Sequence, residues 1–272
     1  MTNAEHQSKR GLAAVILAAG KGTRMQSDLP KVMHEVGDRP MVHWVVDAVR
    51  SSPLEASPVA VVVGFKRETV EDSFAPRPDW MRFPVQAEQL GTGHAIDMAS
   101  PLFQDEALAK NTDVMVLCGD GPLIRTETLA MMLERHVSTG ADATLATSRI
   151  KDPSGYGRIQ RDADGRFQKI VEQKDATPEQ LLIDEVNPSY YVFKADELFS
   201  RLSRLKNDNA NGEYYITDVF ELMKSDGLSI EVIDAVDPED ILSINNPDQL
   251  ATVDSVLRSR LSMASNEEGK NG

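Results

Sequence analysis

A glycine-rich loop with three nearby cations is the first part of this sequence that could do chemistry. Residues 17–25 read LAAGKGTRM and follow an apolar run. Small residues let backbone N–H groups approach phosphate oxygens, and Lys21, Arg24 and Lys31 add positive charge. The pattern predicts a cradle for a triphosphate, the alternative being an ordinary strand-to-helix turn with exposed cations. The loop lacks both the Walker A spacing and the Gly-x-Gly-x-x-Gly fingerprint, which disfavours a P-loop NTPase and a dinucleotide-dependent oxidoreductase.

A carboxylate at the end of a second buried run is a candidate metal ligand. Asp120 follows the apolar run 113–118 in the sequence CGD. A strand that ends there would project the carboxylate into a cleft, where it is a hard oxygen ligand for Mg²⁺. Asp-Gly is also common in turns, so a turn residue is the alternative for Asp120 taken alone.

The elements that must position these residues alternate between apolar runs and helical patterns. Apolar runs that predict buried strands lie at 13–18, 58–63, 113–118 and 143–147. Patterns that predict helices lie at 40–49, 67–74, 93–99, 126–137, 194–204, 218–223 and 247–261. Alternation of this kind predicts an α/β fold, with a Rossmann-like, mostly parallel central sheet and helices on both faces. Ligands are expected at the carboxyl ends of its strands.

The chain is expected to form one domain with polar ends. Residues 1–11 are predicted to be disordered, as are residues 262–272, so the folded part is 12–261. After about residue 150, Gly155, Gly157 and shorter alternating segments predict a smaller antiparallel part.

Composition restricts the function. The net charge of −14 over 272 residues argues against broad binding to nucleic acid or to an anionic membrane. Cys118 is the single cysteine, which excludes an internal disulfide and favours a reducing, cytoplasmic location. No apolar run approaches the roughly 20 residues that span a bilayer. Lys9, Arg10 and the run 12–19 resemble a short secretory signal, an alternative that the glycine-rich loop disfavours.

Several motifs, in the same order along the chain, resemble those of sugar-phosphate nucleotidyltransferases. The matching segments are LAAGKGTRM with LPK at 29–31, QAEQLGTGHA at 86–95, GYGRI at 155–159, IVEQKDA at 170–176 and NANGEYYITD at 209–218. The branch that they resemble most is the uridyltransferase (pyrophosphorylase) domain of bacterial N-acetylglucosamine-1-phosphate uridyltransferases. The resemblance covers about residues 13 to 250.

This resemblance implies a Mg²⁺-dependent transfer of a uridylyl group from UTP to N-acetylglucosamine 1-phosphate. The products would be pyrophosphate and UDP-N-acetylglucosamine, a cell wall precursor. It also implies the nucleotide-diphospho-sugar transferase fold, with a nucleotide-binding half at about 12–150 and a sugar-binding half at about 151–250. The implied partners are UTP and a sugar 1-phosphate, and the oligomeric state stays open.

The resemblance also assigns roles by position. The nucleotide-binding residues would be Leu17, Ala18, Ala19, Gly20, Lys21 and Gly22, with Gln86, Gly91 and Thr92 reading the uracil base. The sugar-binding residues would be Gly157, Glu172 and Asn187. The catalytic residues would be Arg24, Lys31 and Asp120, with Asp120 sharing the metal with Asn245.

Three departures from the family pattern bear on the sugar. The family usually has a Tyr in place of Cys118, a bulkier residue in place of Gly121, and Asn-Thr-Gly where this chain has Asn187 followed by Pro188 and Ser189. Another sugar 1-phosphate or dTTP therefore stays an alternative, as does a non-catalytic regulator that binds an NDP-sugar.

Relatives often carry a C-terminal acetyltransferase domain of hexapeptide repeats. Such repeats are not visible in this sequence, and acetyl transfer is not expected from it. The histidines lack the spacing of a metal site, and His94 is expected to have a local structural role at the start of a helix.

Overall fold

The computed structural model describes residues 10–234 and 236–268, with side chains up to residue 264. The strands are β1 (Gly11–Leu17), β2 (Glu35–Val36), β3 (Arg39–Pro40), β4 (Val59–Val62), β5 (Met81–Arg82), β6 (Thr112–Cys118), β7 (Ala143–Arg149), β8 (Gly157–Arg161), β9 (Phe167–Val171), β10 (Glu185–Asn187), β11 (Tyr191–Lys194) and β12 (Ile230–Asp234). The α-helices are α1 (Met41–Arg50), α2 (Arg67–Asp72), α3 (Thr92–Asp97), α4 (Glu106–Lys110), α5 (Thr126–Thr139), α6 (Pro178–Leu181), α7 (Ala195–Leu202), α8 (Asp218–Ser225) and α9 (Pro247–Glu268). Short 3₁₀ helices lie at η1 (Thr23–Met25), η2 (Lys31–Met33) and η3 (Ser100–Phe103).

Within these residues, ten strands form one sheet in the order β5-β4-β1-β6-β11-β7-β10-β8-β9, with β12 beside β7. Strand β1 pairs in parallel with β4 and β6, and β7 pairs in parallel with β12. Strand β11 runs antiparallel between β6 and β7. The strands β8, β9 and β10 pair antiparallel at the far edge. The predicted α/β fold, with a mostly parallel centre and an antiparallel part after residue 150, is confirmed.

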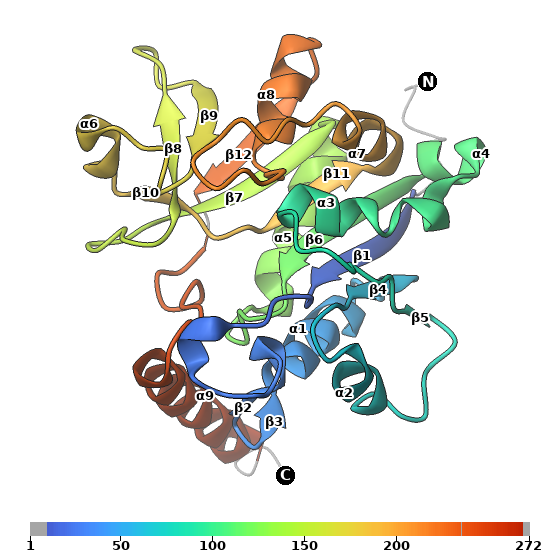
Figure 1. Ribbon diagram of the computed structural model, residues 1–272, viewed down its shortest axis with the longest axis vertical. Helices are drawn as coiled ribbons and strands as arrows, with labels where there is room; N and C mark the ends of the chain where they lie inside the picture. Colours follow the sequence, from blue (N-terminus) through green and yellow to red (C-terminus); the bar gives the residue numbers. More distant parts are fainter. Residues whose placement is uncertain (1–9, 235, 269–272) are drawn as a thin grey trace.

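Helices cover both faces of the central sheet (Figure 1). Side chains of β1 alternate between the faces because successive residues of a strand point in opposite directions. Ala14 and Ile16 pack in one apolar layer with α1 and α5. Ala13 and Val15 pack in a second layer with α3, α7 and α8. The short run of small and β-branched residues in β1 is therefore buried on both sides, as an inner parallel strand must be.

Both predicted chain ends need correction. Strand β1 begins at Gly11, which was expected to be disordered, because the Gly11 amide donates to the Asn111 carbonyl at 2.8 Å. Helix α9 continues to Glu268, past the expected end at residue 261. Its apolar residues Val253 and Leu257 pack with Met41 and its neighbours, and the sequence contains no glycine or proline between 248 and 268 to end the helix. The rest of the two predicted tails, 1–9 and 269–272, lies outside the described residues.

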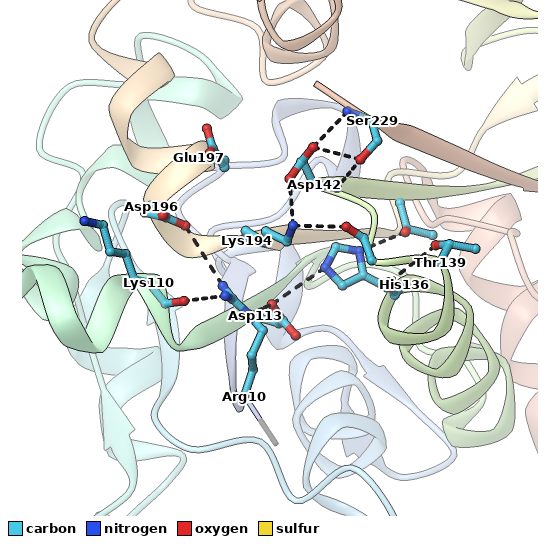
Figure 2. Close-up of polar contacts among 12 residues, drawn as sticks. Arg10, Lys110, Asp113, His136, Thr139, Asp142, Lys194, Asp196, Glu197 and Ser229 are labelled. Atoms are coloured by element: carbon cyan, nitrogen blue, oxygen red, sulfur yellow. Dashed lines mark hydrogen bonds and ion pairs between the residues drawn. The ribbon is translucent and has the colours of Figure 1, made fainter. Parts of the chain in front are cut away.

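A partly buried ion pair fastens the start of β1 to β6 (Figure 2). Arg10 Nε lies 2.5 Å from Asp113 Oδ1, and the Asp113 side chain is 2% exposed. The same guanidinium donates to the carbonyls of Lys110 and Thr112. His136 Nε2 lies 3.7 Å from Asp113 on the other side. This network lies at the amino ends of β1 and β6.

In the described part of the chain, no helix is long and apolar enough to cross a membrane.

We expect Arg10→Met to lower the free energy of unfolding by about 3 kcal/mol, because it leaves the buried Asp113 carboxylate without its cation. Urea unfolding of the variant and the wild type measures this difference. Adding Asp113→Asn to the variant should restore most of the loss, because the uncompensated charge is then gone. A loss of the same size in the double variant would contradict the ion-pair explanation.

Candidate active site

A cavity of about 300 Å³ opens at the carboxyl end of β1. The glycine-rich loop forms one wall of it, through Leu17, Ala19 and Gly20. Gln86 and Gly91 line the same cavity. The cavity therefore lies between the predicted phosphate cradle and the predicted base-reading segment.

The other three predicted loop residues do not line this cavity. Ala18 is buried in the core, and Lys21 Nζ lies 5.2 Å from the centre of the Phe65 ring. Gly22 has φ 67°, and a Cβ there would lie 2.6 Å from Lys31 Cβ. Gly22 thus lets the loop pass close to Lys31, which is a packing role. Contact of these three residues with a nucleotide stays a prediction.

The predicted catalytic and metal-binding residues lie together. Lys31 Nζ contacts Asp120 Oδ2 and donates to Asn245 Oδ1 at 2.8 Å. Arg24 donates to the same Asn245 oxygen, also at 2.8 Å. These four side chains come from the cradle, from the end of β6 and from the segment before α9. Sequence positions more than 200 residues apart therefore meet in one cluster.

The predicted base-reading segment holds the Gln86 amide in a fixed orientation. Gln86 is 4% exposed, and its Nε2 donates to the Gly91 carbonyl at 3.0 Å and lies 3.1 Å from His94 Nδ1. With His94 Nδ1 as the unprotonated nitrogen, both hydrogens of the Gln86 amide are bonded within the protein, one to Gly91 and one to His94. The Ile216 amide donates to Thr92 Oγ1 at 3.0 Å, so Thr92 also fastens the start of α3. Gln86 Oε1 is left as the acceptor available to a ligand.

A second cavity of about 430 Å³ contains all three predicted sugar-binding residues, Gly157, Glu172 and Asn187. Thr217 donates to Glu172 Oε1 at 3.0 Å, and burial raises the pKa of the Glu172 carboxyl. Asn187 Nδ2 donates to the Tyr191 hydroxyl at 2.6 Å. The cavity therefore carries polar groups whose positions are set by other side chains.

Cys118 and Asp120 line both cavities and so stand at their junction. The three departures from the family pattern all reach the second cavity, through Cys118, Gly121, and Pro188 with Ser189. Ser189 is in the left-handed region at φ 64°, where a glycine is favoured. The departures therefore concern the cavity that the predicted sugar-binding residues line.

The residues present fit a magnesium ion. The oxygens of Asp120 and Asn245 both contact Lys31 Nζ, so they lie close to each other. Mg²⁺ prefers hard oxygen ligands and usually takes one or two from protein, with phosphates and water completing its shell. Among the described residues, no group of three or more His, Cys, Asp or Glu side chains could hold a metal ion. A metal here would depend on the phosphates of a substrate.

Comparison with known proteins agrees with this arrangement. The profile of the MobA-like NTP transferase domain matches residues 14–218, a span that includes the cradle, Asp120 and all three sugar-cavity residues. The chain belongs to the MobA-like NTP transferase family. The match ends before Asn245, which reaches the cluster from outside the matched span.

Curated relatives extend the similarity over most of the chain. The "Bifunctional protein GlmU" of Geobacter metallireducens is 46% identical over 251 residues, covering 92% of this chain and 51% of that protein. The protein of the same name from Geotalea uraniireducens is 45% identical and covers 93% of this chain and 54% of its own length. The chain thus spans about half the length of these relatives. An apo UDP-glucose pyrophosphorylase structure shares the fold, with a TM-score of 0.72 at 17% identity, covering 92% of this chain and 99% of that one.

Some site residues were missed by the sequence reasoning. Gln89 lines the first cavity and donates to the Ala19 carbonyl at 2.8 Å. Glu213 lines the same cavity from the segment before α8. His94, expected to have a local structural role at the start of a helix, is the third residue of α3, and its contact with Gln86 was not foreseen. All three belong to motifs that carry the resemblance, and that membership was the available signal.

The Cys118 thiol should react slowly with iodoacetamide at pH 8. Burial, with a smaller contribution from the Asp120 charge, raises its pKa to about 12, so the reactive thiolate is scarce. We expect alkylation at least about 100-fold slower than in urea-unfolded protein, measured by intact-protein mass spectrometry. Equal rates in the folded and unfolded states would contradict the raised pKa.

Proposed function

We propose that this chain transfers a uridylyl group from UTP to N-acetylglucosamine 1-phosphate, with release of pyrophosphate. The observation that carries the proposal is the junction of the two cavities. A cluster of Arg24, Lys31, Asp120 and Asn245 lies between a cavity lined by the Gln86 amide and a cavity lined by the polar side chains of Glu172 and Asn187. The resemblance of the motifs and the similarity to proteins named GlmU support the choice of substrates.

The orientation of Gln86 supports a pyrimidine with a ring N–H. Its Nε2 is held by Gly91 and His94, so Oε1 is the group that meets the base. Uracil offers an N–H donor at N3, which this oxygen accepts. Cytosine offers a lone pair at the same place, which would leave two acceptors facing each other in a buried site. Thymine offers the same N–H, so dTTP is the alternative nucleotide.

The reaction needs positioning and charge neutralisation more than proton transfer. The sugar 1-phosphate is already anionic near neutral pH, so its oxygen attacks the α-phosphorus without a general base. Lys31 and Arg24 hold phosphate oxygens and stabilise the charge that develops on pyrophosphate. Asp120 and Asn245 are the residues that would hold Mg²⁺. When bound, the ion neutralises phosphate charge and favours attack at phosphorus.

Pyrophosphate release is the direct test. Purified protein with UTP, Mg²⁺ and N-acetylglucosamine 1-phosphate should release pyrophosphate, and EDTA should abolish the release. Parallel reactions with dTTP and with glucose 1-phosphate give the preferred pair. We expect Asp120→Ala to lower kcat by at least about 100-fold while circular dichroism shows an intact fold. Near-normal turnover in the folded variant would remove Asp120 from the metal site.

A regulator that binds an NDP-sugar without catalysis gives a different result in this assay. It would bind nucleotide and release no pyrophosphate with any pair. A binder has no need of a cation and carboxylate cluster at the junction of the two cavities, so the retained cluster favours the enzyme.

His94 should act as a positioning residue for base selection. In His94→Phe the Gln86 amide loses its imidazole partner and can rotate, so the fixed acceptor is lost. We expect the preference for UTP over CTP, as a ratio of kcat/KM values, to fall by about tenfold. His43→Phe is the matched control, since His43 stacks on Phe74 at 4.1 Å and does not line the base cavity. An unchanged UTP/CTP ratio in His94→Phe would exclude this role.

A further inference from the structure

Gly121 is a glycine that the backbone does not require. Its φ lies outside the left-handed region, and a Cβ added there would meet only the Tyr190 hydroxyl at 3.8 Å and the Cys118 carbonyl at 4.0 Å. Gly119, two residues earlier, differs because a Cβ there would lie 2.9 Å from the Leu17 carbonyl. A Cβ at position 121 would therefore fit without strain, and its absence leaves that volume unfilled.

The open space belongs to the second cavity, because Gly121 lines it. The Tyr190 side chain does not fill this space. The Tyr190 side chain is buried, and its hydroxyl donates to the Asp240 carbonyl at 2.9 Å. This bond fastens the ring to the segment that leads to Asn245. The volume beside Gly121 is therefore available to whatever the cavity binds.

The other departures in this cavity contact one another, whereas Gly121 has no side chain that could do so. The Ser189 side chain neighbours the Cys118 thiol and the Tyr191 hydroxyl. The Ser189 amide donates to Asn187 Oδ1 at 3.1 Å. The bond to Asn187 helps to hold the Ser189 backbone in its left-handed conformation, and Cys118, Asn187 and Ser189 all line the cavity wall. Among the departures, Gly121 alone has no side chain to contact the others, so the volume beside it stays unfilled.

We infer that Gly121 sets the size limit for the substituent on the sugar, and that the cavity accepts N-acylated hexosamine 1-phosphates larger than the N-acetyl form. This inference rests on the proposed function. The acyl chain is the part of such a substrate that can grow without adding charge, and a one-carbon extension needs apolar volume more than new hydrogen bonds. The space that a side chain at 121 would take is volume of that kind.

The test compares three substrates with wild type, Gly121→Ala and Gly121→Val. Glucose 1-phosphate, N-acetylglucosamine 1-phosphate and N-propanoylglucosamine 1-phosphate are each assayed for kcat/KM with UTP and Mg²⁺. In the wild type, the N-propanoyl substrate should stay within about threefold of the N-acetyl one. In Gly121→Val that ratio should fall by at least about tenfold, with Gly121→Ala in between, because a single methylene at a filled pocket wall costs this much discrimination. Glucose 1-phosphate should lose least.

The outcomes separate the inference from the proposed function. Wild-type release of pyrophosphate with parallel losses on all three substrates, or with no loss, overturns the role of Gly121 and leaves the transferase standing. A wild type that rejects the N-propanoyl substrate more than tenfold also overturns it. No release by the wild type with any sugar phosphate overturns the proposed function itself. If Gly121→Val does not fold, the Gly121→Ala series decides, because its added carbon makes only contacts of ordinary length.

Discussion

The parallel register between β1 and β6 is the constraint on which the site depends. Leu17 pairs with Cys118, and the Gly119 amide donates to the Leu17 carbonyl at 2.9 Å. The cradle and Asp120 therefore leave the sheet side by side at the same edge, as parallel neighbours require. A slip of one residue would exchange the β1 side chains between the two apolar layers of the core. It would also move the cradle and Asp120 apart. The core that fixes this register thus also fixes the distance between the cations and the carboxylate.

The second constraint is the return of the chain from the antiparallel part to the cradle. Asn245 follows β12 at the far side of the sheet, yet it contacts Lys31 and Arg24. Two tyrosines that line the second cavity hold the segment that leads to Asn245. Tyr156 donates to the Ile241 carbonyl and Tyr190 to the Asp240 carbonyl, each at 2.9 Å. The same hydrogen bonds therefore fix the wall of the second cavity and the position of Asn245. A change in the wall is expected to shift Asn245, and the reverse.

Sequence patterns predicted what depends on local periodicity. The central strands and most helices follow from apolar runs, and the ends of two such runs indicate that Asp120 and the cradle lie at the same edge of the sheet. The approach of Asn245 depends on tertiary packing, so it came only from the resemblance. The contact of His94 with Gln86 depends on how residues 87–91 fold back, which no periodicity encodes. The extended end of α9 was missed because its polar residues resemble a tail, while Leu257 and its neighbours anchor the helix.

Charge explains how an acidic chain can hold two polyanions in one orientation. Arg24 and Lys31 concentrate positive charge at the junction of the cavities, where phosphates must meet. The second cavity is lined by the carboxyl of Glu172 instead. Burial, with the charges of Glu221 and Glu172, raises the pKa of nearby Asp218 to about 6. In the proposed reaction these acids would repel phosphates, whereas sugar hydroxyls would find an acceptor in Glu172. In the proposed reaction a sugar 1-phosphate would therefore enter with its phosphate toward Lys31 and its ring toward Glu172. In that orientation its phosphate oxygen would face the triphosphate.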